Sequence, residues 1–199
     1  MNCAFDPLTH TYRIDDRPVT SVTQVLRDVL PGWQAGEWYM QRGTAVHACA
    51  AMIARGEKFN HDARIDGQVA ACRRVFEEIK PVPILVEHPV YSDRYQFAGT
   101  LDLACNIKHR DIIIDWKAQL TESAAIQCAA YALALREAHP ILDVRWGMGV
   151  ELHDDGTYKC CNDLYDLRRY KHEWLALLTT FNVRRRLGIK EEKGEPGNV

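Results

Sequence analysis

The sequence lacks several features that would set it apart from ordinary globular proteins. None of its hydrophobic runs reaches the roughly 20 residues that cross a bilayer, so no membrane association is expected. The N-terminus has no basic segment followed by an apolar stretch, which predicts no secretion signal and a cytoplasmic location. With 12 glycines and 8 prolines in 199 residues, a collagen-like or low-complexity chain is also excluded.

The seven cysteines show no pattern typical of a disulfide framework or a metal cluster. Their number is odd, they are widely scattered, and no two of them form the CxxC pair that zinc ribbons and iron–sulfur clusters use. The neighbours Cys160 and Cys161 would point to opposite faces of a strand, which makes joint ligation of one metal difficult. We therefore expect small buried thiols and no iron–sulfur cluster.

An excess of positive charge is missing too, since 25 Lys and Arg residues face 27 Asp and Glu residues, for a net charge of −2. A uniformly basic nucleic-acid-binding surface is therefore excluded, although a local one is not. Residues 168–190 contain seven basic residues and one acidic residue. Within this segment we expect Trp174 and Phe181 to pack on the core, because they recur with leucines at helical spacing.

The arginine cluster of this segment is the better candidate for contact with a phosphate backbone. It consists of Arg184, Arg185 and Arg186. Arg42 is a secondary candidate, for which solvation of an exposed helix face is the alternative.

Changes of hydrophobic period divide the chain into one domain over residues 1–190 and a polar tail over residues 191–199. Within the domain we expect a helical part over 20–80, a sheet with one helix over 83–161 and a basic helix over 164–187. This order of elements predicts an α/β domain with a mixed central sheet. Strands are expected over residues 10–15, 83–91, 95–106, 111–118, 143–153 and 157–161, and helices over residues 22–29, 36–55, 62–79, 121–138 and 164–187.

Capping residues mark the ends of three of these helices. Thr20 or Ser21 can cap the first helix, and Thr121 and Ser123 are candidates at the start of the helix over 121–138. Gly188 is suited to end the last helix, because glycine adopts the left-handed conformation that follows many helices.

The segment from Gly99 to Ala118 contains two β-rich runs around a polar break and predicts a hairpin. If the turn is centred between residues 108 and 109, the numbers of cross-strand partners sum to about 217, and Asp102 lies opposite Asp115. Lys117 is two residues beyond Asp115 and shares its face of the strand. The sequence therefore predicts that two carboxylates and one ammonium group meet at one place on the sheet.

A carboxylate at the end of a buried strand needs a nearby positive charge to compensate its own. Aspartate is rare inside strands, yet Asp115 directly follows the apolar run of residues 112–114. A hard divalent cation such as Mg²⁺ supplies the charge, since it binds to one or two carboxylates together with waters and phosphate oxygens. A neighbouring lysine can then stabilise negative charge on a phosphate. A plain salt bridge between Lys117 and one aspartate remains the alternative.

Four further polar residues stand near this hairpin in the sequence. Glu87 lies within an apolar strand, His47 lies on an alanine-rich helix, and Gln127 and Tyr131 are four residues apart on one helix face. Each has an ordinary structural explanation when it is considered alone.

Taken in order, these residues resemble the PD-(D/E)XK nucleases. Within them they are most similar to the RecB-type exonuclease branch, which includes phage recombination exonucleases and the mitochondrial genome maintenance exonuclease. The resemblance runs from about Gly43 to Ala138 and implies a restriction-endonuclease-like fold, in which helices flank a mixed central sheet. It rests on RGTAVH with His47, Glu87 in the first core strand, GTLDL with Asp102, DWK with Asp115 and Lys117, and QxxxY with Gln127 and Tyr131.

The resemblance also implies roles for the acidic residues and the lysine. Asp102 and Asp115 would bind a catalytic Mg²⁺ or Mn²⁺, with the carbonyl group of Trp116 as a further ligand. Lys117 would orient or activate the attacking water. Glu87 would assist metal or water binding.

For the remaining motif residues the resemblance implies positions beside the metal and the DNA. His47 would lie next to the metal site, while Gln127 and Tyr131 would help to position the DNA strand. Some relatives carry four cysteines for an iron–sulfur cluster, and the cysteine spacing of this chain does not match them.

The implied activity is that of a metal-dependent DNA exonuclease in recombination, repair or DNA degradation. Its partner would be DNA, single-stranded or at duplex ends, together with a recombination or single-strand-binding protein. By analogy, the size of the chain suggests an enzyme of a phage or mobile element, acting in the host cytoplasm. A structure-specific endonuclease of the same fold and an inactive DNA-binding module are the alternatives.

Overall fold

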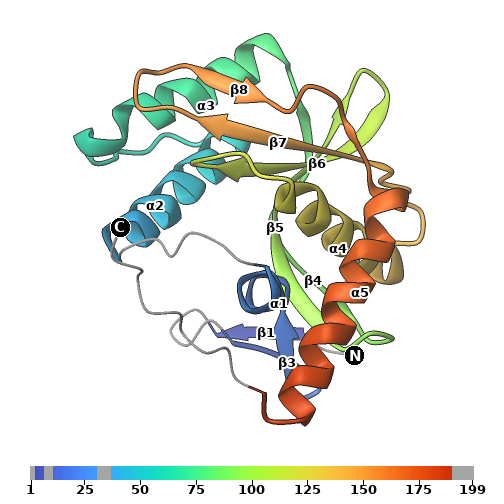
Figure 1. Cartoon of the computed structure of the whole chain (residues 1–199). Helices are drawn as coiled ribbons and strands as arrows, with labels where there is room; N and C mark the ends of the chain where they lie inside the picture. Colours follow the sequence, from blue (N-terminus) through green and yellow to red (C-terminus); the bar gives the residue numbers. More distant parts are fainter. Residues whose placement is uncertain (1–2, 7–10, 31–36, 190–199) are drawn as a thin grey trace.

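Two apolar strands form the centre of the molecule, whose computed structural model describes residues 3–6, 11–30 and 37–189 (Figure 1). They are β5 (Phe97–Ile107) and β6 (Arg110–Lys117), which pair in an antiparallel hairpin. The run of Ile112, Ile113 and Ile114 on β6 is buried throughout. Both faces of this strand are therefore covered by other elements.

The central hairpin belongs to a mixed sheet whose strands run in the order β1-β2-β3-β5-β6-β7-β8, with β4 paired to β5 and β9 to β7. Two strand pairs are parallel, β3 with β5 and β6 with β7, and the other pairs are antiparallel. The predicted α/β class with a mixed central sheet is therefore confirmed. The other strands are β1 (Cys3–Asp6), β2 (Thr11–Ile14), β3 (Arg17–Ser21), β4 (Val82–Ser92), β7 (Trp146–Leu152), β8 (Tyr158–Cys160) and β9 (Tyr165–Asp166).

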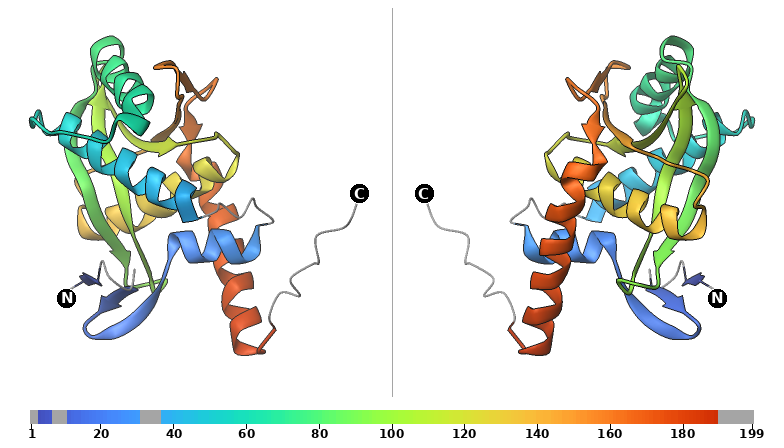
Figure 2. Two further views of the ribbon diagram at one scale, coloured as in Figure 1. Left: turned by 90° about the vertical axis from the view of Figure 1, so that its left-hand side faces the viewer. Right: turned by 90° about the vertical axis from the view of Figure 1, so that its right-hand side faces the viewer.

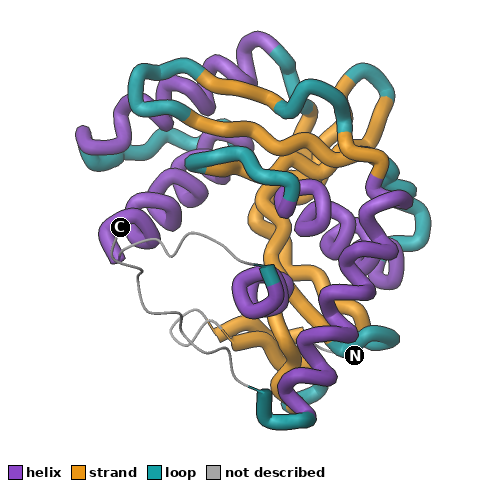
Figure 3. The backbone as a smooth tube through the Cα atoms, in the orientation of Figure 1, coloured by secondary structure: helices purple, strands orange, loops and turns teal. Residues whose placement is uncertain are grey.

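Helices cover the two faces of the sheet, as Figures 1 and 3 show. On one face α1, α4 and α5 bury a core that includes Phe97, Ile113 and Trp174. On the other face α2 and α3 bury a second core with Ile114 and Trp116. The helices are α1 (Val22–Val29), α2 (Glu37–Ala54), the 3-10 helix η1 (Ala63–Ile65), α3 (Asp66–Glu78), α4 (Ser123–Ala138) and α5 (Leu167–Arg186).

Several expected element boundaries need correction. Strands β1 and β3 were not expected, and the segment predicted as one helix over 62–79 is divided into η1 and α3. The last helix begins at Leu167 rather than near residue 164, because the short strand β9 precedes it and Asp166 accepts a capping hydrogen bond from the backbone of Arg168. The predicted tail over 191–199 lies outside the described residues.

The helix caps agree with prediction at two ends and differ at one. Ser21 caps α1 in a reciprocal capping box with Gln24, and Gly188 follows α5 with a φ angle of 68°. At the start of α4 the cap position is Glu122, which has no side-chain capping bond. Thr121 and Ser123 instead share a hydrogen bond of 2.7 Å between their hydroxyl oxygens. The prediction that they cap α4 is therefore wrong.

Figure 2 shows that α2 and α5 lie on different sides of the sheet and that the end of α5 projects away from its centre. Among the described helices, none combines the length and the apolar composition that crossing a membrane requires.

Candidate active site

The register of the β5–β6 hairpin brings the predicted aspartates to the same end of the sheet. Its pairs run from Ile107–Arg110 to Leu103–Ile114, which agrees with the predicted turn between residues 108 and 109. Asp102 and Asp115 follow the last pair on their respective strands. There the backbone N–H of Trp116 donates to Oδ2 of Asp102 at 2.9 Å, so a side chain replaces the next bond of the ladder.

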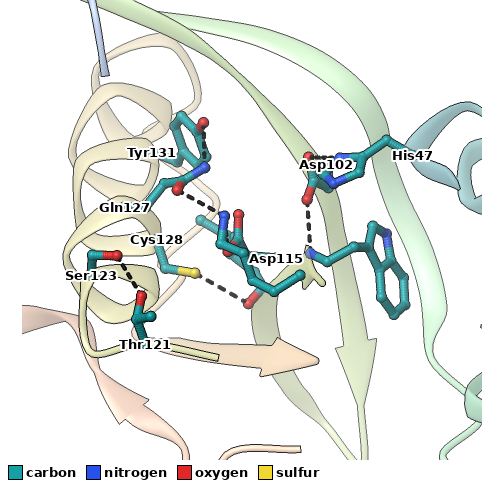
Figure 4. Close-up of polar contacts among 11 residues, drawn as sticks. His47, Asp102, Asp115, Thr121, Ser123, Gln127, Cys128 and Tyr131 are labelled. Atoms are coloured by element: carbon teal, nitrogen blue, oxygen red, sulfur yellow. Dashed lines mark hydrogen bonds and ion pairs between the residues drawn. The ribbon is translucent and has the colours of Figure 1, made fainter. Parts of the chain in front are cut away.

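Asp102 is buried, and two groups hold its carboxylate in place. Besides the Trp116 amide, the imidazole Nδ1 of His47 lies 3.1 Å from Oδ1 of Asp102 (Figure 4). Burial alone would raise the pKa of Asp102, but the charge and hydrogen bond of His47, together with the charge of Lys117, lower it. Burial likewise opposes protonation of His47, yet Asp102 outweighs it and raises the pKa of His47 to about 9.

Glu87 lies opposite Asp102 on β4. The register pairs Val86 with Leu103 and His88 with Leu101, and Glu87 stands between these pairs with a φ angle of 46°. A positive φ is unusual for a residue other than glycine and is typical of strained backbone at functional sites. Burial, and then the nearby charge of Asp102, raises the pKa of Glu87 to about 7.

These three side chains form a compact set of metal-ligating atoms. His47, Glu87 and Asp102 each offer one such atom, and these atoms all lie within 4.8 Å of one another. They come from α2, β4 and β5. We call His47, Glu87 and Asp102 the ligand half of the site.

Asp115 is the most buried carboxylate of the site, with 1% of its surface exposed. Nζ of Lys117 lies 2.8 Å from Oδ2 of Asp115 as an ion pair, and neither carboxylate oxygen has a partner that meets hydrogen-bond geometry. Burial, only partly offset by the charge of Lys117 and reinforced by that of Asp102, raises the pKa of Asp115 to about 6. Burial would lower the pKa of Lys117, but Asp115 and Asp102 raise it, so that this amine stays charged.

A chain of hydrogen bonds extends from Lys117 into α4. Nζ of Lys117 donates to Oε1 of Gln127 at 3.0 Å, and Nε2 of Gln127 donates to the hydroxyl oxygen of Tyr131 at 3.0 Å (Figure 4). Both helix residues are buried. We call Asp115, Lys117, Gln127 and Tyr131 the lysine half of the site.

Electrostatic effects join the two halves. The pKa of Asp102 depends on Lys117, that of Asp115 on Asp102 and His47, and that of His47 on both Lys117 and Asp115. The structure therefore brings all seven predicted motif residues, Tyr131 included, together in one polar cluster. Asp115 is not a member of the set within 4.8 Å, and metal binding by Asp102 and Asp115 stays a prediction.

The backbone N–H of Trp116 donates a hydrogen bond to Asp102. Its side chain packs in the core, where the centroids of its ring and of the Phe76 ring are 6.3 Å apart. The predicted role of its carbonyl group as a metal ligand stays a prediction.

A cavity of about 40 Å³ adjoins the site and is lined in part by Gln68, which was not among the predicted site residues. His47, Lys117 and Gln68 line it, together with Arg42. Gln68 is buried, donates to Asp154 through Nε2, and has an Oε1 atom without a partner. No sequence signal pointed to Gln68, because glutamine on a helix is usually solvated.

The predicted phosphate-binding arginines have different locations. Arg42 lines the cavity beside His47 and forms an ion pair with Asp154 at 3.3 Å. Arg184 and Arg185 line a groove beside α1, where Nη1 of Arg184 donates to the carbonyl oxygen of Asp28 at 3.0 Å. Figure 1 shows this end of α5 pointing away from α2 and β6. The cluster that includes Arg186 therefore lies apart from the site, and its contact with DNA stays a prediction.

No family model and no curated protein matches the chain. Among solved structures, the chain is similar to the crystal structure of LHK-Exo in complex with dAMP, with a TM-score of 0.41 and 14% sequence identity over 85% of this chain and 93% of that chain. It is also similar to the crystal structure of an alkaline exonuclease (LHK-Exo) from Laribacter hongkongensis, with a TM-score of 0.36 and 15% identity over the same shares.

Proposed function

We propose that this protein is a metal-dependent deoxyribonuclease that hydrolyses phosphodiester bonds, acting from DNA ends as an exonuclease. The observation that carries the proposal is the meeting of three buried or half-buried acids, Glu87, Asp102 and Asp115, beside the charged amine of Lys117. A buried acidic cluster is costly for a protein unless a cation or a reaction uses it.

The donor set fits a hard divalent cation such as Mg²⁺ or Mn²⁺. Carboxylate oxygens are the ligands that these ions prefer, and the buried oxygens of Asp115 lack hydrogen-bond partners. Asp102 and Glu87 would hold the ion, with Asp115 and the imidazole of His47 as further donors. When bound, such an ion supplies Lewis-acid polarisation of a phosphate and activation of water.

The protein's own groups would then act on the phosphodiester. The charge of Lys117 stabilises negative charge that develops on a phosphate oxygen, and this effect is strong because the amine is mostly shielded from solvent. The Trp116 amide fixes the orientation of Asp102 before the substrate binds. Glu87, with a pKa of about 7, can exchange a proton near neutral pH.

Arg42 offers a positive charge beside the same cavity, where it can contact a neighbouring phosphate. The preference for DNA ends, and a place in recombination or repair beside a single-strand-binding protein, rest on the motif resemblance alone.

The deciding experiment incubates end-labelled linear DNA and closed circular DNA with the protein in Mg²⁺, in Mn²⁺ and in EDTA. We expect linear DNA to be degraded in either metal, circular DNA to survive, and EDTA to stop the reaction. Asp102→Asn serves as the matched inactive variant. Equal cleavage of circles would identify an endonuclease.

Absence of cleavage in both metals, with DNA binding that Asp115→Ala leaves unchanged, would identify an inactive DNA-binding module instead. That result would contradict the proposed enzyme activity.

A further inference from the structure

The direction of the hydrogen-bond chain in the lysine half follows from the chemistry of its members. A protonated lysine amine only donates hydrogen bonds, so the group of Gln127 that faces Lys117 must be the carbonyl oxygen Oε1. The amide nitrogen Nε2 must then face Tyr131, whose hydroxyl oxygen accepts the bond. The reverse orientation of the Gln127 amide would place its NH₂ group against the ammonium group of Lys117, so that two donors would face each other.

The hydrogen bonds from Lys117 to Gln127 and from Gln127 to Tyr131 restrict the position of the lysine amine. Lys117 forms an ion pair with Asp115 at 2.8 Å and donates a hydrogen bond to Gln127 at 3.0 Å. These two partners, from β6 and α4, hold the amine in one position. Without such partners, rotation about the bonds of the lysine side chain would let the charged amine move through a wider volume.

Gly99 contributes to the same arrangement from β5. A Cβ atom at this position would lie 2.7 Å from Cε1 of the Tyr131 ring and 3.3 Å from Cγ2 of Val22. The ring of Tyr131 therefore packs against the bare backbone of Gly99. A larger residue at position 99 would displace this ring and, with it, the hydroxyl group that orients Gln127.

Both helix residues are nearly closed to solvent. Gln127 is 8% exposed and Tyr131 is 3% exposed, and the polar groups of the Gln127 amide are occupied by Lys117 and Tyr131. The side chain of Lys117 is 23% exposed, so it is more accessible to a DNA strand than either helix residue.

We propose that Gln127 and Tyr131 are positioning residues that aim the amine of Lys117, and that they act without direct contact to DNA. Gly99 provides the space that this arrangement needs. The inference rests on the proposed nuclease function, and it differs from the role in DNA contact that the motif resemblance implies.

The test measures single-turnover cleavage of linear DNA over a range of protein concentrations, which separates the rate constant of the chemical step from the half-saturating concentration. Gln127→Met keeps the side-chain volume but removes the acceptor, and we expect the rate constant to fall about 10- to 100-fold at an unchanged half-saturating concentration. Gln127→Glu keeps an acceptor for Lys117 and should restore most of the rate. Tyr131→Phe should reduce the rate about three- to tenfold, while Tyr170→Phe on α5 is the matched control.

A double-mutant cycle tests whether the effect passes through the lysine. In a Lys117→Met background, Gln127→Met should change the residual rate less than twofold, because the group that it positions is already absent. A half-saturating concentration raised tenfold at an unchanged rate constant would overturn the proposal in favour of direct DNA contact. Full additivity in the cycle would overturn it as well.

A crystal structure of Gln127→Met gives a result that does not depend on activity and also shows that the variant is folded. We expect the amine of Lys117 to be displaced or disordered relative to Asp115. An unchanged amine position would overturn the positioning role even if the wild-type protein does not cleave DNA, whereas a displaced amine in a protein without cleavage would reject only the proposed function.

Discussion

The two halves of the site are built in opposite ways. The ligand half takes His47, Glu87 and Asp102 from three separate elements, α2, β4 and β5, and its atoms converge within 4.8 Å. The lysine half takes Lys117 and its partners from β6 and the following helix α4, which are neighbours in sequence. Its members follow one another as a chain of contacts between 2.8 and 3.0 Å.

This difference separates two physical tasks. Converging carboxylates repel one another and are stabilised by a cation, so the ligand half is suited to bind a metal. A linear chain of donors and acceptors restricts one charged group, so the lysine half is suited to aim a charge at a substrate. The two helices that complete the halves, α2 and α4, cover opposite faces of the sheet and meet the site where the β5–β6 ladder ends.

The largest effects should distinguish the halves directly. Asp102→Asn should reduce the cleavage rate about 10³-fold or more and abolish Mn²⁺ binding, because the central ligand is lost. Lys117→Met should reduce the rate about 10²- to 10³-fold but leave Mn²⁺ affinity within about threefold. Isothermal titration with Mn²⁺ and single-turnover cleavage measure the two quantities. Loss of Mn²⁺ binding in Lys117→Met would contradict the division of the site into two halves with separate tasks.

Metal affinity should depend on pH in a direction set by the ligand half together with Asp115. Burial raises the pKa of Glu87 to about 7 and that of Asp115 to about 6, while Asp102 raises the pKa of His47 to about 9 against the effect of burial. Each group must lose its proton before it can bind a cation. We therefore expect Mn²⁺ affinity to increase about 10- to 100-fold between pH 6 and pH 8.5. An affinity that is flat over this range would show that the bound ion does not compete with these protons.

The smallest effect concerns stability without metal. The folded-state pKa of Asp115, about 6, exceeds its ordinary value of 3.8, so the free energy of unfolding falls as the pH rises from about 3.8 to about 6 and stays lowered above that range. In EDTA, Asp115→Asn should be more stable than the wild-type protein at pH 8 by about 1–3 kcal/mol, a rise of a few degrees in Tm. At pH 4, near the ordinary pKa of 3.8, the difference should be small. Thermal unfolding at both pH values measures it, and a difference independent of pH would contradict this account.

Local patterns predicted the central hairpin well. The turn between residues 108 and 109 has positive φ angles at Lys108 and His109, which suits a tight two-residue hairpin, and a symmetric turn fixes the register of both strands. The register then determines where Asp102 and Asp115 lie. Capping by Ser21 was predictable for the same reason, because it depends on residues three positions apart.

Contacts between distant segments were not predictable in this way. The positive φ angle of Glu87 depends on how β4 packs against elements far along the chain. The same holds for α3 and Gln68, whose Oε1 atom has no hydrogen-bond partner while its Nε2 atom donates to Asp154. The sequence also contains no information on the direction of α5 relative to the sheet. The arginines at 184–186 therefore could be recognised as a basic cluster, but not placed beside α1.

The division of the site into a ligand half and a lysine half is tested most directly by anomalous X-ray diffraction. The crystals are soaked with Mn²⁺ and a short DNA strand. The account predicts a peak bound by Asp102 and Glu87, with a phosphate oxygen between the ion and the amine of Lys117. A peak elsewhere on the protein, or a phosphate bound away from Lys117 with no ion at Asp102, would contradict it.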